Sequence, residues 1–197
     1  MNTHFIIFDL ESTCWKLKKP PRKEIIEIGA VRIDEMGQEI SVFSSFVRPI
    51  ITPKLSNFCK KLTGISQEEV DRAATFDEVI LDFEDWLFEH DVNLVLASWG
   101  DYDLKQFALD ADYHGLTFKW LDQHICLNDQ HARFHGLRQP LSVTNALNAD
   151  GLSFSGETHR AINDAHNTVE IFRHHLGNWK FSKAHFTKVP SHSLWRI

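Results

Sequence analysis

The stretch IIFDLESTCW, residues 6–15, runs an apolar strand directly into two carboxylates, Asp9 and Glu11. Residues 4–11 are apolar at consecutive positions, a pattern typical of a strand buried on both faces of a sheet. Side chains at i and i+2 of a strand project to the same face, so Asp9 and Glu11 are neighbours. Two such carboxylates repel, and one takes up a proton unless a cation lies between them. A D-x-E pair alone also fits a solvated strand end, so a cation site is indicated only if other parts of the chain supply further ligands.

The segments that follow predict an α/β fold. Strands over 24–34 and 39–48, with a turn at Gly37, indicate a three-strand antiparallel meander with the first strand. Capping boxes at Ser66 and Thr75 open two helices. The other expected elements are a short helix within 55–64, strands over 92–99 and 117–120, and helices over 76–89, 103–113, 122–133, 142–148 and 158–176. A meander followed by β/α units predicts a mixed central sheet flanked by helices.

Composition indicates one globular domain. The 197 residues suffice for one core, which we expect over 1–177, with 178–197 as a C-terminal tail or docked extension. No apolar run approaches the ~18 residues of a membrane span, and no signal peptide is evident. The 3 cysteines are scattered, which favours reduced thiols and a cytoplasmic location. The net charge of −6 argues against a protein that coats nucleic acid, but it does not exclude an enzyme acting on one.

A second buried strand also ends in acids. LASWGDYD passes through Gly100 into Asp101 and Asp103. Ligands of open α/β sheets gather where strands end, although either acid also fits a helix N-cap. The pattern alone leaves both Asp101 and Asp103 open as the site residue.

The third candidate segment is THRAINDAHN, residues 158–167. Asp164 lies about 60° around a helix from Ala161, on the flank of the apolar stripe, so it stays close to the sheet. His159 faces the same site only if it lies at or before the first helical turn, with Thr158 as the N-cap. The positive end of a helix disfavours an imidazolium, which leaves His159 neutral and able to accept a proton.

Together these residues indicate a site for hard cations. Carboxylate oxygens with few nitrogens suit Mg²⁺ or Mn²⁺ better than zinc. Two such ions a few ångströms apart are a known arrangement for in-line attack on a phosphodiester. A neutral histidine then completes deprotonation of the attacking water as general base.

The motifs FDLEST, ASWGDYDL and HRAINDAHN, in this order, resemble the DEDDh branch of the 3′–5′ exonuclease superfamily, which has a ribonuclease-H-like fold. The resemblance covers about residues 4–176 and is closest to the histone-mRNA and enhanced-RNA-interference exonucleases. The chain is also similar to bacterial proteins called inhibitors of a sporulation-kinase pathway, presumed exonucleases. The resemblance implies that Asp9, Glu11 and Asp164 bind one metal ion, that Asp9 is shared with a second ion supported by Asp101, and that His159 is the base.

The resemblance also implies how substrate is held. A terminal nucleotide would lie against the backbone around Leu10–Thr13 and against the LTGI segment with Leu62 and Ile65, and Trp99 is either a stacking surface or a core residue. A basic run could follow the phosphate backbone of a flexible strand: Lys16, Lys18, Lys19, Arg22 and Lys23. The leading hypothesis is a metal-dependent exoribonuclease that acts on single-stranded 3′ ends and releases nucleoside 5′-monophosphates, without a separate RNA-binding domain. A DNA-directed exonuclease of the proofreading type and a regulatory or scaffold protein that keeps the fold remain alternatives.

One pair of histidines lies outside these motifs. His131 and His135 have the i, i+4 spacing of metal ligands. No third ligand follows at a helical interval and no HExxH motif is present. We therefore interpret the pair as part of a half-exposed helix.

Overall fold

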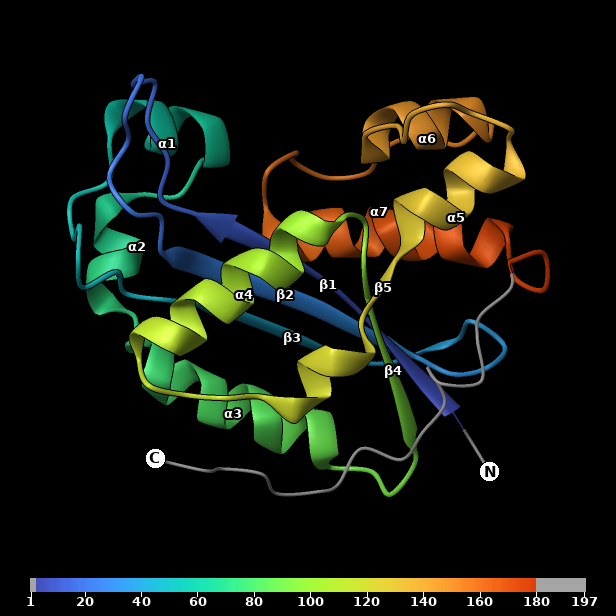
Figure 1. Cartoon of the computed structure of the whole chain (residues 1–197), viewed down its shortest axis with the longest axis horizontal. Helices are drawn as coiled ribbons and strands as arrows, with labels where there is room; N and C mark the ends of the chain where they lie inside the picture. Colours follow the sequence, from blue (N-terminus) through green and yellow to red (C-terminus); the bar gives the residue numbers. More distant parts are fainter. Residues whose placement is uncertain (1–2, 180–197) are drawn as a thin grey trace.

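A mixed five-stranded sheet forms the centre of the molecule (Figure 1). The computed structural model describes residues 3–179, so most of the predicted extension at 178–197 lies outside the described residues. The strands, in the sheet order β3-β2-β1-β4-β5, are β3 (Glu39–Phe46), β2 (Ile25–Ile33), β1 (Thr3–Ser12), β4 (Asn93–Ser98) and β5 (Ile125–Cys126). The first three strands pair antiparallel, whereas β4 runs parallel to both β1 and β5. The predicted meander and the central position of β1 are confirmed.

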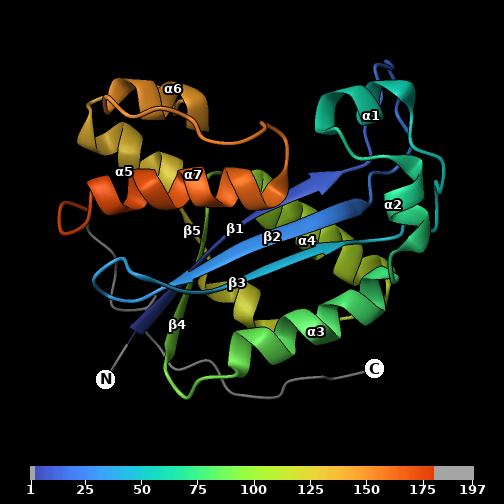
Figure 2. The same ribbon diagram turned by 180° about the vertical axis from the view of Figure 1, so that it is seen from behind.

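Helices cover both faces of this sheet. They are α1 (Asn57–Thr63), α2 (Gln67–Arg72), α3 (Phe76–Phe88), α4 (Asp101–Tyr113), α5 (Leu127–Phe134), α6 (Val143–Ala149) and α7 (Ala161–His174). Alternate residues of β1 point to opposite cores: Phe8 packs with Phe83 of α3 and Phe107 of α4, and Ile7 packs with Phe172 of α7. Figure 2 shows α7 lying across the face opposite α4. None of the helices within residues 3–179 is long and apolar enough to cross a membrane.

Local sequence signals account for most helix boundaries. The predicted capping boxes at Ser66 and Thr75 are both present, with Glu69 and Glu78 completing them. Gly64 ends α1 in the left-handed region at φ 71°, a conformation that glycine adopts without steric cost.

After α4 one predicted strand is wrong, and the predicted helix that follows it begins later than expected. The structure has a 3-10 helix over Lys119–Gln123 where a strand near 117–120 and the start of a helix at 122 were expected. Phe118 and Trp120 are apolar and close in sequence, which mimics a strand, but both pack into the α3–α4 core from this turn. The local strand is the two-residue β5, and α5 begins only at Leu127.

Gly29 allows α7 to lie directly on β2. A Cβ atom at this position would be 2.2 Å from the backbone nitrogen of Ile162, which leaves no room for any other residue. The small residues Ala161 and Ala165, both fully buried, form the helix side of this contact. As a result the first turn of α7 lies against the sheet close to the end of β1.

Candidate active site

Three carboxylates meet where β1 ends. Asp9 and Glu11 come from one face of β1, and Asp164 comes from the first turn of α7. One ligand atom from each lies within 4.8 Å of the other two, a spacing at which all three can hold one metal ion. Oδ2 of Asp164 is buried and has no hydrogen-bond partner among the described residues. Because a buried polar atom without a partner is costly, this oxygen is suited to a cation.

A fourth carboxylate, from Asp103, lines the same cavity. Its side chain is almost fully buried, whereas the Asp101 side chain is 61% exposed and pairs with Lys105 on the outer surface. The prediction that Asp101 lies with the other acids is therefore wrong, and Asp103 takes its place. The reason is that α4 already begins at Asp101, and two residues along a helix turn a side chain by about 200°. We call Asp9, Glu11, Asp103 and Asp164 the carboxylate cluster.

Burial and mutual repulsion raise the pKa values throughout the carboxylate cluster. Burial, with the charges of Asp103, Asp164 and Glu11, raises the pKa of Asp9 well above its usual range. The pKa of Glu11 rises to about 8 for the same reasons. Burial raises that of Asp103 to about 7, although hydrogen bonds with Leu10 and Ser98 oppose the rise. Near neutral pH the cluster therefore holds protons that a divalent cation could replace.

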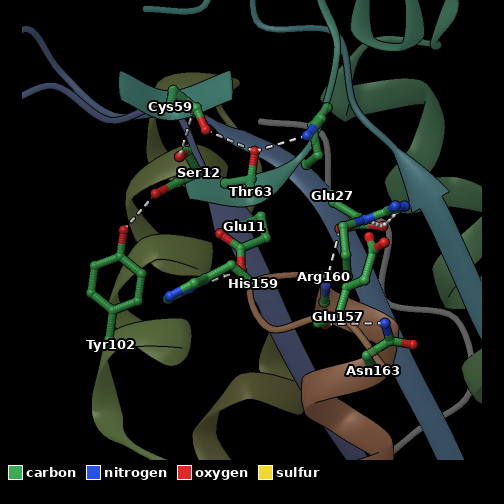
Figure 3. A network of polar contacts seen from close by, with 12 residues as sticks. Glu11, Ser12, Glu27, Cys59, Thr63, Tyr102, Glu157, His159, Arg160 and Asn163 are labelled. Carbon is green, nitrogen blue, oxygen red and sulfur yellow. Dashed lines mark hydrogen bonds and ion pairs between the residues drawn. The ribbon is translucent and has the colours of Figure 1, made fainter. Parts of the chain in front are cut away.

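His159 lies beside this cluster, immediately before α7. Its Nδ1 atom is 3.9 Å from Oε1 of Glu11, and its side chain is 51% exposed (Figure 3). The N-cap of α7 is Arg160 and not Thr158, so His159 precedes the first turn, as a shared site requires. It has a φ of 61°, in the left-handed region that non-glycine residues rarely adopt. Such strain is typical of functional positions and needs surrounding contacts to maintain it.

A buried ion pair supplies such contacts. Nη2 of Arg160 donates to Oε1 of Glu27 at 2.9 Å, and the backbone N–H of Ala161 donates to Oε2 at 3.0 Å (Figure 3). Glu27 lies on β2 with its side chain buried. The pair thereby ties the start of α7, next to His159, to the sheet. The sequence contained a signal that we missed, because a glutamate within the apolar strand EIIEIGAV needs a partner.

The cavity over the carboxylate cluster has a volume of about 600 Å³. Of the residues predicted to contact a nucleotide, Leu10, Leu62 and Trp99 line it. Trp99 is mostly buried, and its indole N–H donates to the carbonyl of Leu141 at 2.8 Å. One face of this tryptophan therefore belongs to the core and another to the cavity wall.

The other two predicted nucleotide contacts do not reach the cavity. The hydroxyl of Thr13 is buried and accepts the backbone N–H of Glu24 at 2.9 Å. Ile65 is fully buried in a small core cluster that includes Cys59 and Val70. Neither side chain is exposed, and neither residue is among those that line the cavity.

The basic run divides into two parts. Lys23 lines the cavity, and its Nζ donates to the Tyr102 hydroxyl at 3.0 Å. Arg22 lines an adjoining cavity that shares Lys23 and Tyr102. The other members are exposed and line neither cavity: Lys16, Lys18 and Lys19.

Several lining residues were missed by the sequence analysis. Tyr102 lies between the two candidate acids of α4, and its hydroxyl is 2.6 Å from Oγ of Ser12 (Figure 3). The start of α6 forms the opposite wall through Ser142, Val143 and Thr144. The N-cap Ser142 is visible in the sequence, but nothing local indicates that this helix end lies over β1.

Comparison with known proteins places this site in a family. The exonuclease family model (RNase T) matches residues 6–172. The chain belongs to this exonuclease family. As the resemblance implied, it falls in the DEDDh branch, whose members depend on divalent metal ions. Among solved structures, the nuclease domain of 3′hExo bound to rAMP, a DEDDh family member, superposes with a TM-score of 0.82 at 27% identity, covering 96% of this chain and 97% of that one. The predicted ribonuclease-H-like α/β fold is thereby confirmed.

Curated relatives of this chain come from animals and bacteria. ERI1 exoribonuclease 2 of Xenopus laevis is 31% identical over 194 residues, which cover 85% of this chain and 28% of the relative. The probable 3′-5′ exonuclease KapD of Bacillus subtilis is 29% identical over 172 residues, 85% of this chain and 82% of the relative. The chain thus spans less than a third of the Xenopus protein but most of the length of KapD.

Proposed function

We propose that this chain is a metal-dependent 3′–5′ exonuclease that removes nucleoside 5′-monophosphates from single-stranded ends, with RNA preferred. The observation that carries the proposal is the carboxylate cluster, in which three ligand atoms lie within 4.8 Å and the Oδ2 atom of Asp164 is buried without a partner in the described chain. Four buried or half-buried acids at the end of one strand are unfavourable unless cations neutralise them.

The donor set fits two Mg²⁺ or Mn²⁺ ions, because it consists of carboxylate oxygens. Asp9, Glu11 and Asp164 would hold one ion, Asp9 would be shared with the second, and Asp103 would support that second ion. When bound, the ions lower the pKa of the attacking water and stabilise the leaving oxygen. The roles proposed below for His159 and the cavity-lining residues follow from their positions around the carboxylate cluster.

His159 is suited to remove the proton of the attacking water. Half of its side chain is exposed at the cavity, so water reaches the ring, and Nδ1 lies 3.9 Å from Glu11. Burial raises the pKa of Asp164, although the charge of His159 and the backbone N–H groups of His159 and Arg160 oppose the rise. The segment that positions the base thus also limits the protonation of a metal ligand.

The cavity walls fit one terminal nucleotide. A volume of about 600 Å³ is in the range of small-ligand pockets. Leu62 and Trp99 offer apolar surface to a base, while Lys23 and Arg22 continue into the adjoining cavity, where a phosphate backbone could follow. Two relatives support RNA: one is named an exoribonuclease and one was solved with rAMP. The free thiols of Cys14, Cys59 and Cys126 accord with the proposed cytoplasmic location.

The test uses purified protein with 5′-labelled single-stranded RNA and DNA of one sequence, in Mg²⁺ or Mn²⁺. We expect a ladder that shortens from the 3′ end, stronger on RNA, and absent with the Asp9→Asn/Glu11→Gln variant. RNA with a blocked 3′ terminus is the control for direction, and its ladder should be lost.

Each other result changes a defined part of the proposal. Equal ladders on both strands would replace the RNA preference with a general or DNA-directed activity. Products of internal cleavage from the blocked RNA would contradict the 3′–5′ direction. If the wild type binds RNA and DNA but cleaves neither with either metal, the protein is a regulatory or scaffold protein and not a nuclease.

A further inference from the structure

A second group of metal-ligating side chains lies apart from the carboxylate cluster. It consists of His131, His135, Asp150 and His175, and one ligand atom of each lies within 4.8 Å of all the others. We call these four residues the histidine cluster. The interpretation of His131 and His135 as an ordinary half-exposed pair is therefore incomplete, because two further ligands arrive from distant parts of the chain.

The distances from the three imidazoles to Asp150 are close to those between the ligands of a tetrahedral ion. Three imidazole Nε2 atoms face the Asp150 carboxylate, at 3.3 Å for His131, 2.9 Å for His135 and 3.0 Å for His175. Ligand atoms about 2.0–2.1 Å from a tetrahedral Zn²⁺ ion lie about 3.3 Å from one another. The side chains thus already converge at nearly the separation that such an ion needs.

The surroundings of the histidine cluster are closed. Side-chain exposure is 0% for His131, 1% for Asp150 and 2% for His175, and only His135, at 28%, reaches the surface. A buried, fully protein-ligated set is typical of a structural metal site, whereas a catalytic site keeps an open position. His135 marks the side from which an ion could enter.

Helix geometry favours positive charge at this place. His135, Asp150 and His175 are the C-caps of α5, α6 and α7. Figures 1 and 2 both show these three helices side by side at one end of the sheet. The C-terminal ends of helices carry partial negative charge, so three of them, together with the Asp150 carboxylate, attract a cation.

The chemistry of the four ligands favours one kind of ion. Neutral imidazoles with one carboxylate suit Zn²⁺ and are poor ligands for Mg²⁺.

We propose that His131, His135, Asp150 and His175 form a structural Zn²⁺ site that ties the C-terminal ends of α5, α6 and α7 together. These helices reach the catalytic cavity: α7 carries Asp164, and the start of α6 lines the wall. The rings of Trp99 and His131 are 5.6 Å apart, so the site also supports that side of the cavity. The proposal stands independently of the reaction catalysed.

The first measurement is metal content and metal response of the full chain. To exclude zinc at the carboxylate cluster, it uses the Asp9→Asn/Glu11→Gln variant, stripped with a chelator and reloaded with zinc chloride. We expect about one zinc ion per chain. Zinc at about 100 times its Kd should raise the Tm by roughly 5–10 °C. Cobalt chloride in place of zinc should give the strong visible absorption of tetrahedral Co²⁺.

Variants of the exposed ligand test the assignment without disturbing the core. In the same background, His135→Ala should weaken zinc binding by at least about 10-fold, the loss that even an outer-shell partner causes. His135→Cys should restore binding, because a thiolate is also a zinc ligand. His174→Ala is the matched control: it removes a neighbouring exposed imidazole but none of the four ligands. Circular dichroism confirms that each variant is folded.

Three results would overturn the site. The reloaded protein could contain no zinc, cobalt could give only the weak spectrum of an octahedral ion, or His135→Ala could bind zinc as tightly as His174→Ala. Loss of zinc with His135→Ala, its retention with His174→Ala and its recovery with His135→Cys would establish it.

Discussion

The carboxylate cluster and the histidine cluster each bring four ligand side chains together, but the electrostatic environments of their acids are opposite. In the carboxylate cluster like charges meet, and burial with mutual repulsion raises the pKa of Glu11 to about 8. In the histidine cluster three imidazoles lie within hydrogen-bond distance of one carboxylate, and the pKa of Asp150 is lowered. The first arrangement brings like charges together, whereas the second pairs one acid with imidazoles, although Nδ1 of His131 and Nδ1 of His175 are buried without a partner in the described chain.

This difference agrees with a catalytic role for the carboxylate cluster and a structural role for the histidine cluster, as proposed above. A site that must bind and release ions and substrate benefits from acids that are unstable alone, and it opens into a cavity of about 600 Å³. A site that holds helices together benefits from a closed set of protein ligands. Helix α7 joins the two, with Asp164 in its first turn and His175 at its C-cap.

The largest expected effect comes from exchanging single acids of α4. Asp103→Asn should lower kcat/KM by at least about 100-fold, comparable with the loss of one preorganised charge-stabilising group. Asp101→Asn, two residues away on the exposed face, should stay within about 2-fold of wild type, because surface ion pairs such as that with Lys105 contribute little. Steady-state kinetics on one RNA measures both. The reverse order would restore Asp101 to the site.

A single methyl group should disturb both clusters at once. Gly29→Ala places a Cβ 2.2 Å from the Ile162 nitrogen, so α7 has to move away from β2. We expect a stability loss of about 1–3 kcal/mol, typical of overpacking. We also expect roughly 100-fold lower activity from misplacement of Asp164 and His159. Denaturant unfolding and kinetics measure the two effects. Gly136→Ala is a control for a glycine substitution without steric contact, although its φ of 63° adds strain.

Stability without metal should improve when the carboxylate cluster loses a charge. The folded-state pKa of Glu11 is about 8, above its ordinary value of 4.5. The folded state therefore binds more protons between these values, and stability falls as pH rises from about 4.5 to 8. In a chelator at pH 8, Glu11→Gln should melt at least about 2–4 °C above wild type, the shift that corresponds to 1 kcal/mol. Equal melting temperatures at pH 8 would show that the repulsion is already relieved.

The histidine cluster should show the opposite pH response, with a smaller amplitude. Burial lowers the pKa values of His131 and His175 from 6.5, so the unfolded state binds more protons just below that value. Their contribution to stability is therefore present above pH 6.5 and declines as the pH falls below it. Hydrogen-exchange protection factors of the metal-free protein, which correct for the slower intrinsic exchange at low pH, should fall at the ends of α5 and α7 between pH 7 and 5, with α2 as internal reference. A uniform fall in all helices would contradict a local cause.

The sequence predicted those features that depend on short spacing. The i, i+2 spacing on a strand predicted that Asp9 and Glu11 of β1 share a face. The capping boxes, which span three residues, predicted the starts of α2 and α3. The choice between Asp101 and Asp103 depended on where α4 begins. Because α4 begins at Asp101, the side chain of Asp103 and not that of Asp101 faces the cavity. Helix ends are the least certain part of a sequence prediction.

Features that join distant segments could not be predicted in this way. Asp150 and His175 meet His131 only after three helices have packed, and the Glu27–Arg160 pair spans two elements more than a hundred residues apart. The left-handed conformation of His159 is also unmarked locally, since histidine rarely adopts it. Each of these contacts depends on tertiary packing, which a local pattern does not encode.

The position of β1 between an antiparallel and a parallel neighbour has a consequence for folding order. On one side Phe5 pairs with Ile33, so that half of the sheet can form as soon as the meander exists. On the other side Thr3 pairs with Asn93, a contact that closes a loop of about 90 residues. During synthesis the first strand must therefore keep one edge unpaired until β4 has emerged, about 90 residues later. We expect this parallel pairing to form late and to limit the folding rate.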